Sequence, residues 1–258
     1  MKISVLSSGS KGNSTLVMTN NTKILIDLGV TKSYAESKLE EIKVDPNDIE
    51  AILITHTHVD HIQGLKVFLK KYHPKLYVNN VILQLLHEYI TDFDYVLYDT
   101  PNFQIGDLDV EVIKTSHDVK GSVGFIVRGD DKSLVYITDT GYINNKYFNK
   151  LMNHNLYVLE SNHDPKMLMD GNYPFHLKQR ILSDKGHLSN NDSAYYLSNF
   201  IGDKTKTIIL AHLSDDNNTY DKALDTLNEV LSSKNKKVEH IIIAKQKQRT
   251  DMIEVWLK

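Results

Sequence analysis

The stretch that determines the fold is His56-Thr57-His58-Val59-Asp60-His61, in which four of the six side chains are potential metal ligands. It follows a short apolar run, Ala51–Ile54, which we expect to form a buried strand, and it precedes an expected helix over Ile62–Lys71. In an extended segment His56 and His58 point to the same side, and Asp60 and His61 then turn toward a second point nearby. Loops at strand ends are where a rigid frame carries a site. The stretch therefore predicts a metal centre rather than a polar surface loop.

Four ligands cannot complete two metal sites, and three more candidates stand at or just after the ends of expected strands. His117 follows strand Leu108–Thr115, Asp139 follows Leu134–Thr138, and His212 follows Thr207–Ala211. Each residue alone is more often a satisfied polar side chain, but their repeated placement beside the first stretch favours ligands. The chain has no cysteine, which excludes thiolate ligands and disulfides. Imidazole and carboxylate groups suit zinc, manganese or iron, and we expect zinc.

The rest of the chain alternates between expected strands and helices, without a linker or a repeat. The other expected strands are Lys2–Leu6, Ser14–Met18, Lys23–Asp27, Val123–Val127, Leu156–Glu160, His240–Ala244 and Met252–Trp256. The other expected helices are Tyr34–Ile42, Val81–Ile90, Asn145–Met152, Phe175–Ser183, Ser189–Phe200 and Tyr220–Ser232. Mixing of this kind predicts helices packed on the faces of sheets, that is, an α/β fold. We expect one domain over residues 1–258.

Composition and charge narrow the functional class. No apolar stretch reaches the length of about 18 residues that a membrane span needs, and the N-terminus lacks the pattern of a signal peptide. We therefore expect a cytoplasmic protein with no membrane partner. The net charge is -3, and the only arginines are Arg128, Arg180 and Arg249. Proteins that grip long nucleic acids usually carry a basic surplus, so composition favours a small substrate.

The ligand stretch and its three partners resemble the metal-binding motifs of the metallo-β-lactamase superfamily. The resemblance extends over almost the whole chain to its YycJ (WalJ) branch, through SSGSKGN (7–13), ITDTGY (137–142), ESNHD (160–164), RILSDKGHLSN (180–190) and HLSDDNN (212–218). It implies a four-layer αβ/βα sandwich with the site at one edge, and a homodimer. It also implies His56, His58 and His117 as ligands of a first metal, Asp60, His61 and His212 as ligands of a second, and Asp139 as the bridge between them.

Two ions about 4 Å apart would hold a hydroxide between them, lower its pKa and take up charge from the substrate oxygens, and a phosphodiester gains most from this arrangement. The leaving oxygen needs a proton. His187 lies in a segment, residues 186–189, that resembles the glycine-histidine-serine motif of RNase Z-like phosphodiesterases, where this histidine contacts the scissile phosphate. A carboxylate at Glu160 would keep His187 charged. The alternative is that His187 is a helix-entry residue without chemistry.

We therefore assign Asp60, His187 and Glu160 to the catalytic group, and expect His163 and Ser189 to contact substrate. Two further expectations are less specific. Tyr142, Tyr173 and Phe175 stack a base or simply complete the core, and the turn over residues 8–13 packs beneath the metal loop.

Three functions compete. The first is a phosphodiesterase for a small cyclic or short nucleotide, which composition favours and which resembles phage proteins that cleave cyclic pyrimidine nucleotides to disarm Pycsar immunity. The alternative is a 5′→3′ DNA exonuclease, the activity associated with the YycJ branch. A carboxyl or thioester hydrolase of the same superfamily is a more distant third. A metal-free scaffold is disfavoured because every expected ligand is present.

Overall fold

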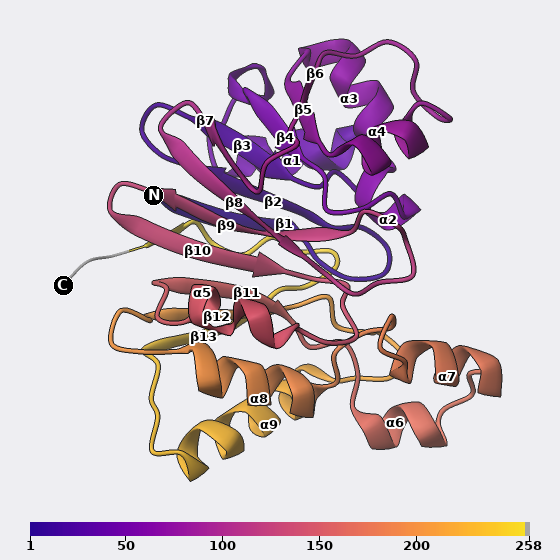
Figure 1. Cartoon of the computed structure of the whole chain (residues 1–258), viewed down its shortest axis with the longest axis vertical. Coiled ribbons are helices and arrows are strands. Elements are labelled where there is room, and N and C mark those ends of the chain that lie inside the picture. The colour runs from indigo at the N-terminus through magenta and orange to yellow at the C-terminus, as the bar shows by residue number, and fades with distance from the viewer. Residues whose placement is uncertain (256–258) are drawn as a thin grey trace.

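The computed structural model describes residues 1–255, so Trp256, the last residue of one expected strand, lies outside the described residues. Two seven-stranded sheets stack face to face, and helices cover their outer faces (Figure 1). The α/β sandwich expected from the sequence is confirmed. Among the described residues, no helix is long and apolar enough to cross a membrane.

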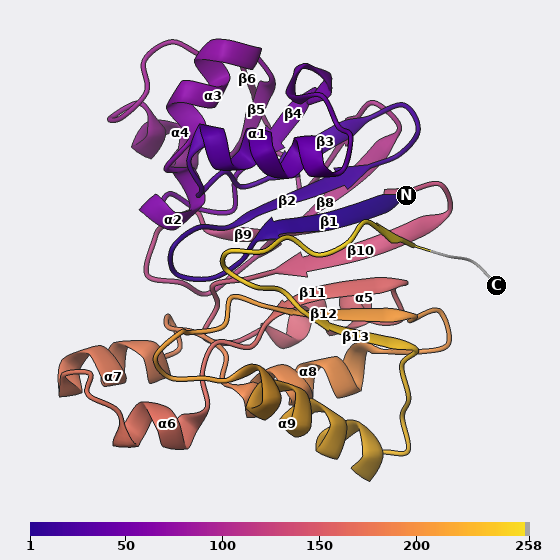
Figure 2. The ribbon, with the colours of Figure 1, turned by 180° about the vertical axis from the view of Figure 1, so that it is seen from behind.

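The first sheet is built from the N-terminal part of the chain and one late strand. Its order is β14 (Ile253–Glu254), β1 (Lys2–Ser7), β2 (Ser14–Met18), β3 (Lys23–Ile26), β4 (Ala51–Leu53), β5 (Lys75–Val78) and β6 (Tyr95–Leu97). Pairing is antiparallel from β14 to β3 and parallel from β3 to β6. Its outer face is covered by helices α1 (Lys32–Glu41), α3 (Leu65–Tyr72) and α4 (Asn80–Leu86), and a 3-10 turn, Pro46–Asp48, leads into β4 (Figure 2).

The second sheet uses the rest of the chain. Its order is β13 (His240–Ile243), β12 (Thr207–Ala211), β11 (Leu156–Glu160), β10 (Lys132–Ile137), β9 (Val123–Gly129), β8 (Leu108–Lys114) and β7 (Asn102–Ile105). Pairing is antiparallel from β7 to β10 and parallel from β10 to β13. Helices α5 (Phe148–Leu151, after a 3-10 turn at Asn145–Tyr147), α8 (Asn190–Phe200) and α9 (Tyr220–Ser233) cover the outer face (Figure 1).

The central strands are buried on both faces, which explains their continuous apolar sequence. In β11, Leu156 and Val158 belong to the core shared with the first sheet, whereas Tyr157 and Leu159 belong to the core beneath α8 and α9. Successive side chains of a strand point to opposite faces, so this alternation joins both cores through one strand. Burial of apolar surface in the shared core holds the two sheets against each other, and burial in the second core holds α8 and α9 on the second sheet.

The parallel strands end at one common edge of the molecule. At this edge lie the short helix α2 (Val59–Ile62) from the first half and helices α6 (Pro165–Asp170) and α7 (Phe175–Leu182) from the second, to the right in Figure 1 and to the left in Figure 2. The loops after β3, β4, β10, β11 and β12 therefore meet there. All the predicted metal ligands stand in these loops, in α2, or in the loop after β8.

The expected elements agree with the structure to within a few residues, with two corrections. The single helix expected over Ile62–Lys71 is split into α2 and α3, because the chain turns at Gly64, where a side chain would collide with the carbonyl oxygen of Val30. The helix expected over Asn145–Met152 is a 3-10 turn followed by one short α-helix. Strands β5, β6 and β7 and helix α6 were not expected. They span only three to six residues, too few to establish the period of a strand or a helix.

Candidate metal centre

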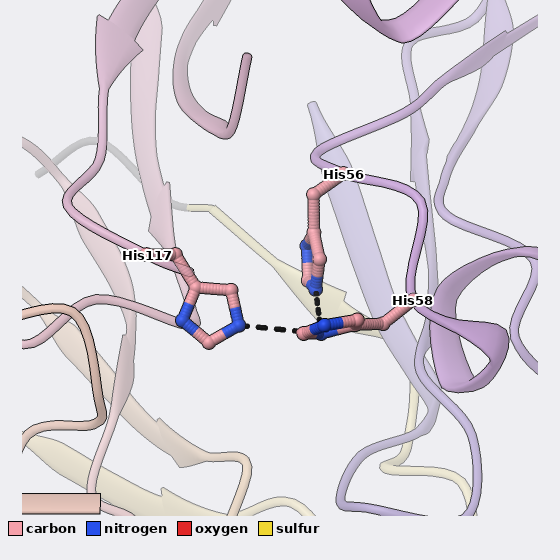
Figure 3. Close-up of side chains that lie close together, drawn as sticks. All are labelled: His56, His58 and His117. Carbon is pink, nitrogen blue, oxygen red and sulfur yellow. Dashed lines mark hydrogen bonds between the residues drawn. The ribbon is translucent and has the colours of Figure 1, made fainter. Parts of the chain in front are cut away.

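Two groups of three predicted ligands lie close enough to hold a metal ion each, and Asp139 takes part in two further groups, one with His56 and His61 and one with Glu160, His187 and His212. In the first, His56 Nε2 lies 3.1 Å from His58 Nδ1, which lies 3.3 Å from His117 Nε2 (Figure 3). In the second, the Nε2 atoms of His61 and His212 each lie 3.6 Å from Asp60 Oδ2. Within each group all the potential ligand atoms lie within 4.8 Å of one another, a spacing that one metal ion can span. The two groups are those expected for the first and second metal.

Asp139 lies between the groups. Its Oδ2 is 3.2 Å from His61 Nε2 in the second group, and its Oδ1 is 3.9 Å from His117 Nε2 in the first. Asp139 Oδ2 and His212 Nε2 are buried without a hydrogen-bond partner among the described residues. Polar atoms buried in this way are costly unless something satisfies them. The unsatisfied atoms and the donor set fit a divalent cation.

The second ring nitrogen of each histidine has a partner of its own. The contacts are His56 Nδ1 with Thr55 Oγ1 (3.1 Å), His58 Nε2 with Asp118 Oδ1 (3.3 Å), His61 Nδ1 with Asp27 Oδ2 (2.7 Å), His117 Nδ1 with the Gly186 carbonyl (3.2 Å) and His212 Nδ1 with Glu160 Oε1 (2.9 Å). In metal sites such outer contacts fix the tautomer and the ring orientation. Here they leave the opposite nitrogen of each ring facing the interior of its group.

Sequence reasoning missed four of these outer partners, two of which, Asp27 and Asp118, are carboxylates. Asp27 follows β3 and accepts hydrogen bonds from the Thr55 backbone and hydroxyl, both at 2.8 Å, besides that from His61. Burial raises the pKa of Asp27, whereas the nearby His61 lowers it. The signal for Asp27 was available, because it ends a predicted strand as Asp139 does. Asp118 sits beside His117 in a loop, and no pattern marked it.

Three of the site residues have left-handed backbone conformations. Asp27, Asp139 and His212 have φ angles of 59°, 53° and 54°. Residues other than glycine rarely adopt this region, and each costs about 1–3 kcal/mol where it is strained. All three come directly or almost directly after strand ends, where the reversal of the chain turns their side chains back toward the edge of the sheets.

The carboxylates of the cluster are charged despite their burial. Burial favours the neutral acid at Asp139, but His212 and His61 hold its pKa well below the usual range. Burial likewise opposes the charged form of His61, yet Asp139 and Asp27 raise its pKa to about 10. At His56 burial dominates and lowers the pKa. Burial also opposes ionisation of Asp60, but His212 and His61 lower its pKa. Ionised Asp60 and Asp139 therefore lie beside an imidazole with high proton affinity, a place that attracts cations.

The turn after β1 packs beneath the metal loop. Asn13 donates from its backbone to the Asp60 carbonyl at 2.8 Å, and its side-chain nitrogen lies 3.0 Å from His61 Nε2. Gly29 lies against the other side, where a Cβ would come within 1.6 Å of the Asp60 carbonyl oxygen. Only glycine allows so close an approach. The turn and Gly29 together fix the backbone that carries Asp60 and His61.

Glu160 connects the metal cluster to His187. Its Oε1 accepts from His187 Nδ1 at 2.7 Å and from His212 Nδ1 at 2.9 Å, and its Oε2 accepts from the backbone of Thr140 and Leu188. Burial opposes ionisation of Glu160, but His187 and His212 lower its pKa to about 2. Burial also lowers the pKa of His187, and Glu160 more than compensates, so that the net shift is upward. This pairing is the one expected from the sequence.

A cavity of about 340 Å³ opens onto the cluster. Its lining includes Asp60, Asp139, His187 and His212, together with Tyr173, Arg180 and Lys185 from the segment around α7. Of the three aromatic side chains considered for base stacking, only Tyr173 lines this cavity. Tyr142 lines a separate depression, and Phe175 is exposed on α7.

His163 and Ser189 are buried and do not line the cavity. Ser189 caps α8, since its hydroxyl accepts from the Asp192 backbone and the Asp192 carboxylate accepts from Ser189 in return. Burial lowers the pKa of His163 to about 4, and neither ring nitrogen has a hydrogen-bond partner among the described residues. A contact of these two residues with substrate stays a prediction.

The fold and the ligand set define a metal-dependent hydrolase. The model of the metallo-beta-lactamase superfamily matches residues 8–212, and the chain belongs to this superfamily. Membership implies divalent metal ions at the histidine and aspartate cluster.

Individual proteins agree with this assignment. The exodeoxyribonuclease YycJ of Bacillus anthracis is 39% identical over 91% of this chain and 90% of its own length. The exodeoxyribonuclease WalJ of Streptococcus pneumoniae is 41% identical over 88% of this chain and 86% of its own. Among solved structures, the metallo-beta-lactamase fold protein YhfI of Bacillus subtilis superimposes with a TM-score of 0.73 at 17% identity, over 96% of this chain and 98% of its own. The last likeness concerns the fold alone.

We predict about two divalent ions per chain, the number that two closed groups of ligands with one bridge would hold. Asp139→Ala is expected to lower the occupancy of both ions, whereas His117→Ala is expected to lower mainly that of the first. Elemental analysis after purification without chelator measures both. His240→Ala is the matched control, because His240 begins β13 at the opposite end of the sheet. Full metal content in Asp139→Ala would contradict the bridge.

Asp118→Ala is expected to weaken binding of the first metal ion by about 10–100-fold, the usual effect of removing a partner of a metal-binding histidine. The reason is that Asp118 is the partner of His58 Nε2 among residues 1–255, and the same oxygen lies 3.4 Å from His117 Nε2. Competition with a chelator of known affinity measures the change. Asp203→Ala, on an exposed turn, serves as control. An unchanged affinity would mean that Asp118 does not orient His58.

Proposed function

We propose that the protein is an exodeoxyribonuclease that hydrolyses DNA phosphodiesters with two divalent ions, for which zinc is the expected metal. The observation that carries the proposal is the similarity to YycJ and WalJ, at about two-fifths identity over most of both chains. The two matches cover 91% and 88% of this chain and 90% and 86% of the relatives, so they are not confined to one segment. The complete set of ligands is consistent with the same chemistry.

This proposal reverses the order of the two substrates expected from composition. The anti-Pycsar proteins Apyc1 of Saccharibacillus brassicae and Paenibacillus xerothermodurans are 38% and 45% identical, but only over 56 residues, 22% of this chain. The exodeoxyribonucleases match four times as much of it. A cyclic mononucleotide therefore stays as the second candidate, supported by this local similarity and by a cavity of nucleotide size.

When bound, divalent ions would supply Lewis-acid chemistry that neutralises charge on the phosphoryl oxygens. The chain itself supplies the proton. Glu160 binds His187 Nδ1, so the other ring nitrogen of His187 is the one available to the cavity. The ionised Glu160 favours the imidazolium form, and His187 can then donate its proton to the leaving oxygen.

Two further features complete the proposal. The whole chain acts as one catalytic domain, since both sheets contribute to the ligand cluster. We also retain the homodimer expected from the family resemblance as a prediction.

The first functional prediction concerns substrate class. The purified protein is expected to release label from end-labelled DNA, and to do so faster than it opens cyclic mononucleotides at the same concentration. Hydrolysis of cyclic nucleotides with no release from DNA would instead support the second candidate. Asp139→Ala serves as the control for a contaminating nuclease, because it should abolish the activity of this protein.

The second functional prediction concerns His187. His187→Ala is expected to lower the rate on DNA by about 10²–10⁴-fold, the usual share of general acid catalysis, without loss of metal. The loss should be smaller on a nitrophenyl phosphodiester, because its leaving group is stable without a proton. His240→Ala again provides the matched control. Equal losses on both substrates, or a drop in bound metal, would contradict the assignment of a proton donor.

A further inference from the structure

Arg180 is an arginine of the cavity whose role the chemistry above leaves open. It lies on α7, lines the cavity, and has a side chain that is 54% exposed. Its Nε donates to Asp118 Oδ2 at 2.6 Å, and its Nη2 contacts the same oxygen. The other oxygen of Asp118 is the one that contacts His58. A single carboxylate thus ties the guanidinium to a ligand of the first metal.

The contact with Asp118 does not use all the hydrogen-bond donors of the Arg180 guanidinium. A guanidinium has five donors in a planar fork that matches phosphate oxygens, and among residues 1–255 Asp118 is the only partner of the Arg180 guanidinium. The other two arginines are engaged far from the cavity: Arg128 pairs with Glu111, and Arg249 pairs with Glu41. Arg180 is therefore the one arginine placed to meet a substrate.

A purely structural role explains Arg180 poorly. None of the α7 side chains is buried, so the helix adds little to the core. An ion pair as exposed as that of Arg180 contributes little to stability. The pair instead restricts the guanidinium to the rim of the cavity, which lowers the entropic cost of binding an anion.

The basic side chains of the cavity lining come from one segment, which we call the α7 rim. They are Arg180 on α7 and Lys185 in the loop after it, and Asp118 offsets part of the charge of Arg180. Among the described residues no other lysine or arginine lines the cavity. An anion beside the metal cluster therefore meets the basic side chains of the lining at the α7 rim.

We propose that the α7 rim is a subsite for a second phosphate of the DNA strand, next to the scissile one, in which Arg180 binds the phosphate and Asp118 positions Arg180. This inference rests on the proposed exodeoxyribonuclease function and specifies which residues would bind a DNA strand beside the scissile phosphate. A cyclic mononucleotide has a single phosphate and cannot occupy both places, so the subsite favours DNA.

The test compares wild type, Arg180→Ala and Arg180→Lys on oligonucleotides in which the phosphate on either side of the first scissile bond is replaced by an uncharged methylphosphonate. Arg128→Ala is the matched control, an arginine of similar exposure with one carboxylate partner. On unmodified DNA, Arg180→Ala is expected to lower kcat/KM for release of the first nucleotide by about 10–100-fold, mainly through KM. Arg180→Lys should recover part of the loss, because it keeps the charge without the fork.

The decisive result is whether the effects of the arginine substitution and of the methylphosphonate replacement on kcat/KM are independent of each other. One of the two methylphosphonates should lower the kcat/KM of wild type about as much as the arginine substitution does. The same methylphosphonate should lower the kcat/KM of Arg180→Ala only a little further. Equal losses in wild type and Arg180→Ala at both positions would overturn the subsite. If wild type releases no nucleotide, the proposed function fails, and fluorescence anisotropy of the labelled oligonucleotide then decides the inference. Binding weakened 10–100-fold by Arg180→Ala would support it, and unchanged binding would overturn it.

Discussion

The mutual approach of three histidine rings, two of them buried and one, His58, partly exposed, is the constraint on which the rest of the site depends. His58 Nδ1 lies within 3.1 to 3.3 Å of nitrogens from both His56 and His117, and beside them Asp139 and His212 each keep a buried atom unsatisfied. Lone pairs brought this close in a buried place are unfavourable without a proton or a cation between them. The outer contacts of the five rings hold them in this arrangement, so that the fold, rather than the metal, sets the geometry.

Neither sheet can form this arrangement alone. Asp27, His56 and His61 come from loops of the first sheet, whereas Asp139 and His212 come from the second. The groups close only when the two sheets stack, which the shared apolar core enforces. This core also stabilises the left-handed backbone at the strand ends, since strained residues persist only where the surroundings determine their conformation. The ligand cluster therefore assembles as the two sheets pack into the sandwich.

A feature of the site could be predicted from the sequence when residues close together in the chain mark it. The ligand stretch, the strand-end residues and the Glu160–His187 pair were recognisable because each is marked by a local pattern. Asp118 and the Gly186 carbonyl were not, because their roles arise from contacts across 60 or more residues, His58 with Asp118 and His117 with Gly186. The edge strands β6 and β7 were missed for another reason. They span only three and four residues, too few to establish a period, and pairing with a neighbour determines their conformation.

Net charge was the least informative sequence property, and the structure explains why. A charge of -3 describes the average surface, whereas a phosphate strand in the cavity meets the field of the few groups that line it. There the carboxylates Asp60, Asp118 and Asp139 oppose Arg180 and Lys185. Two divalent cations would reverse this balance and make the lining positive. If the proposed function holds, attraction for DNA would depend on the bound metal, and a protein of net negative charge would bind the end of a strand at its site without binding the length of the duplex.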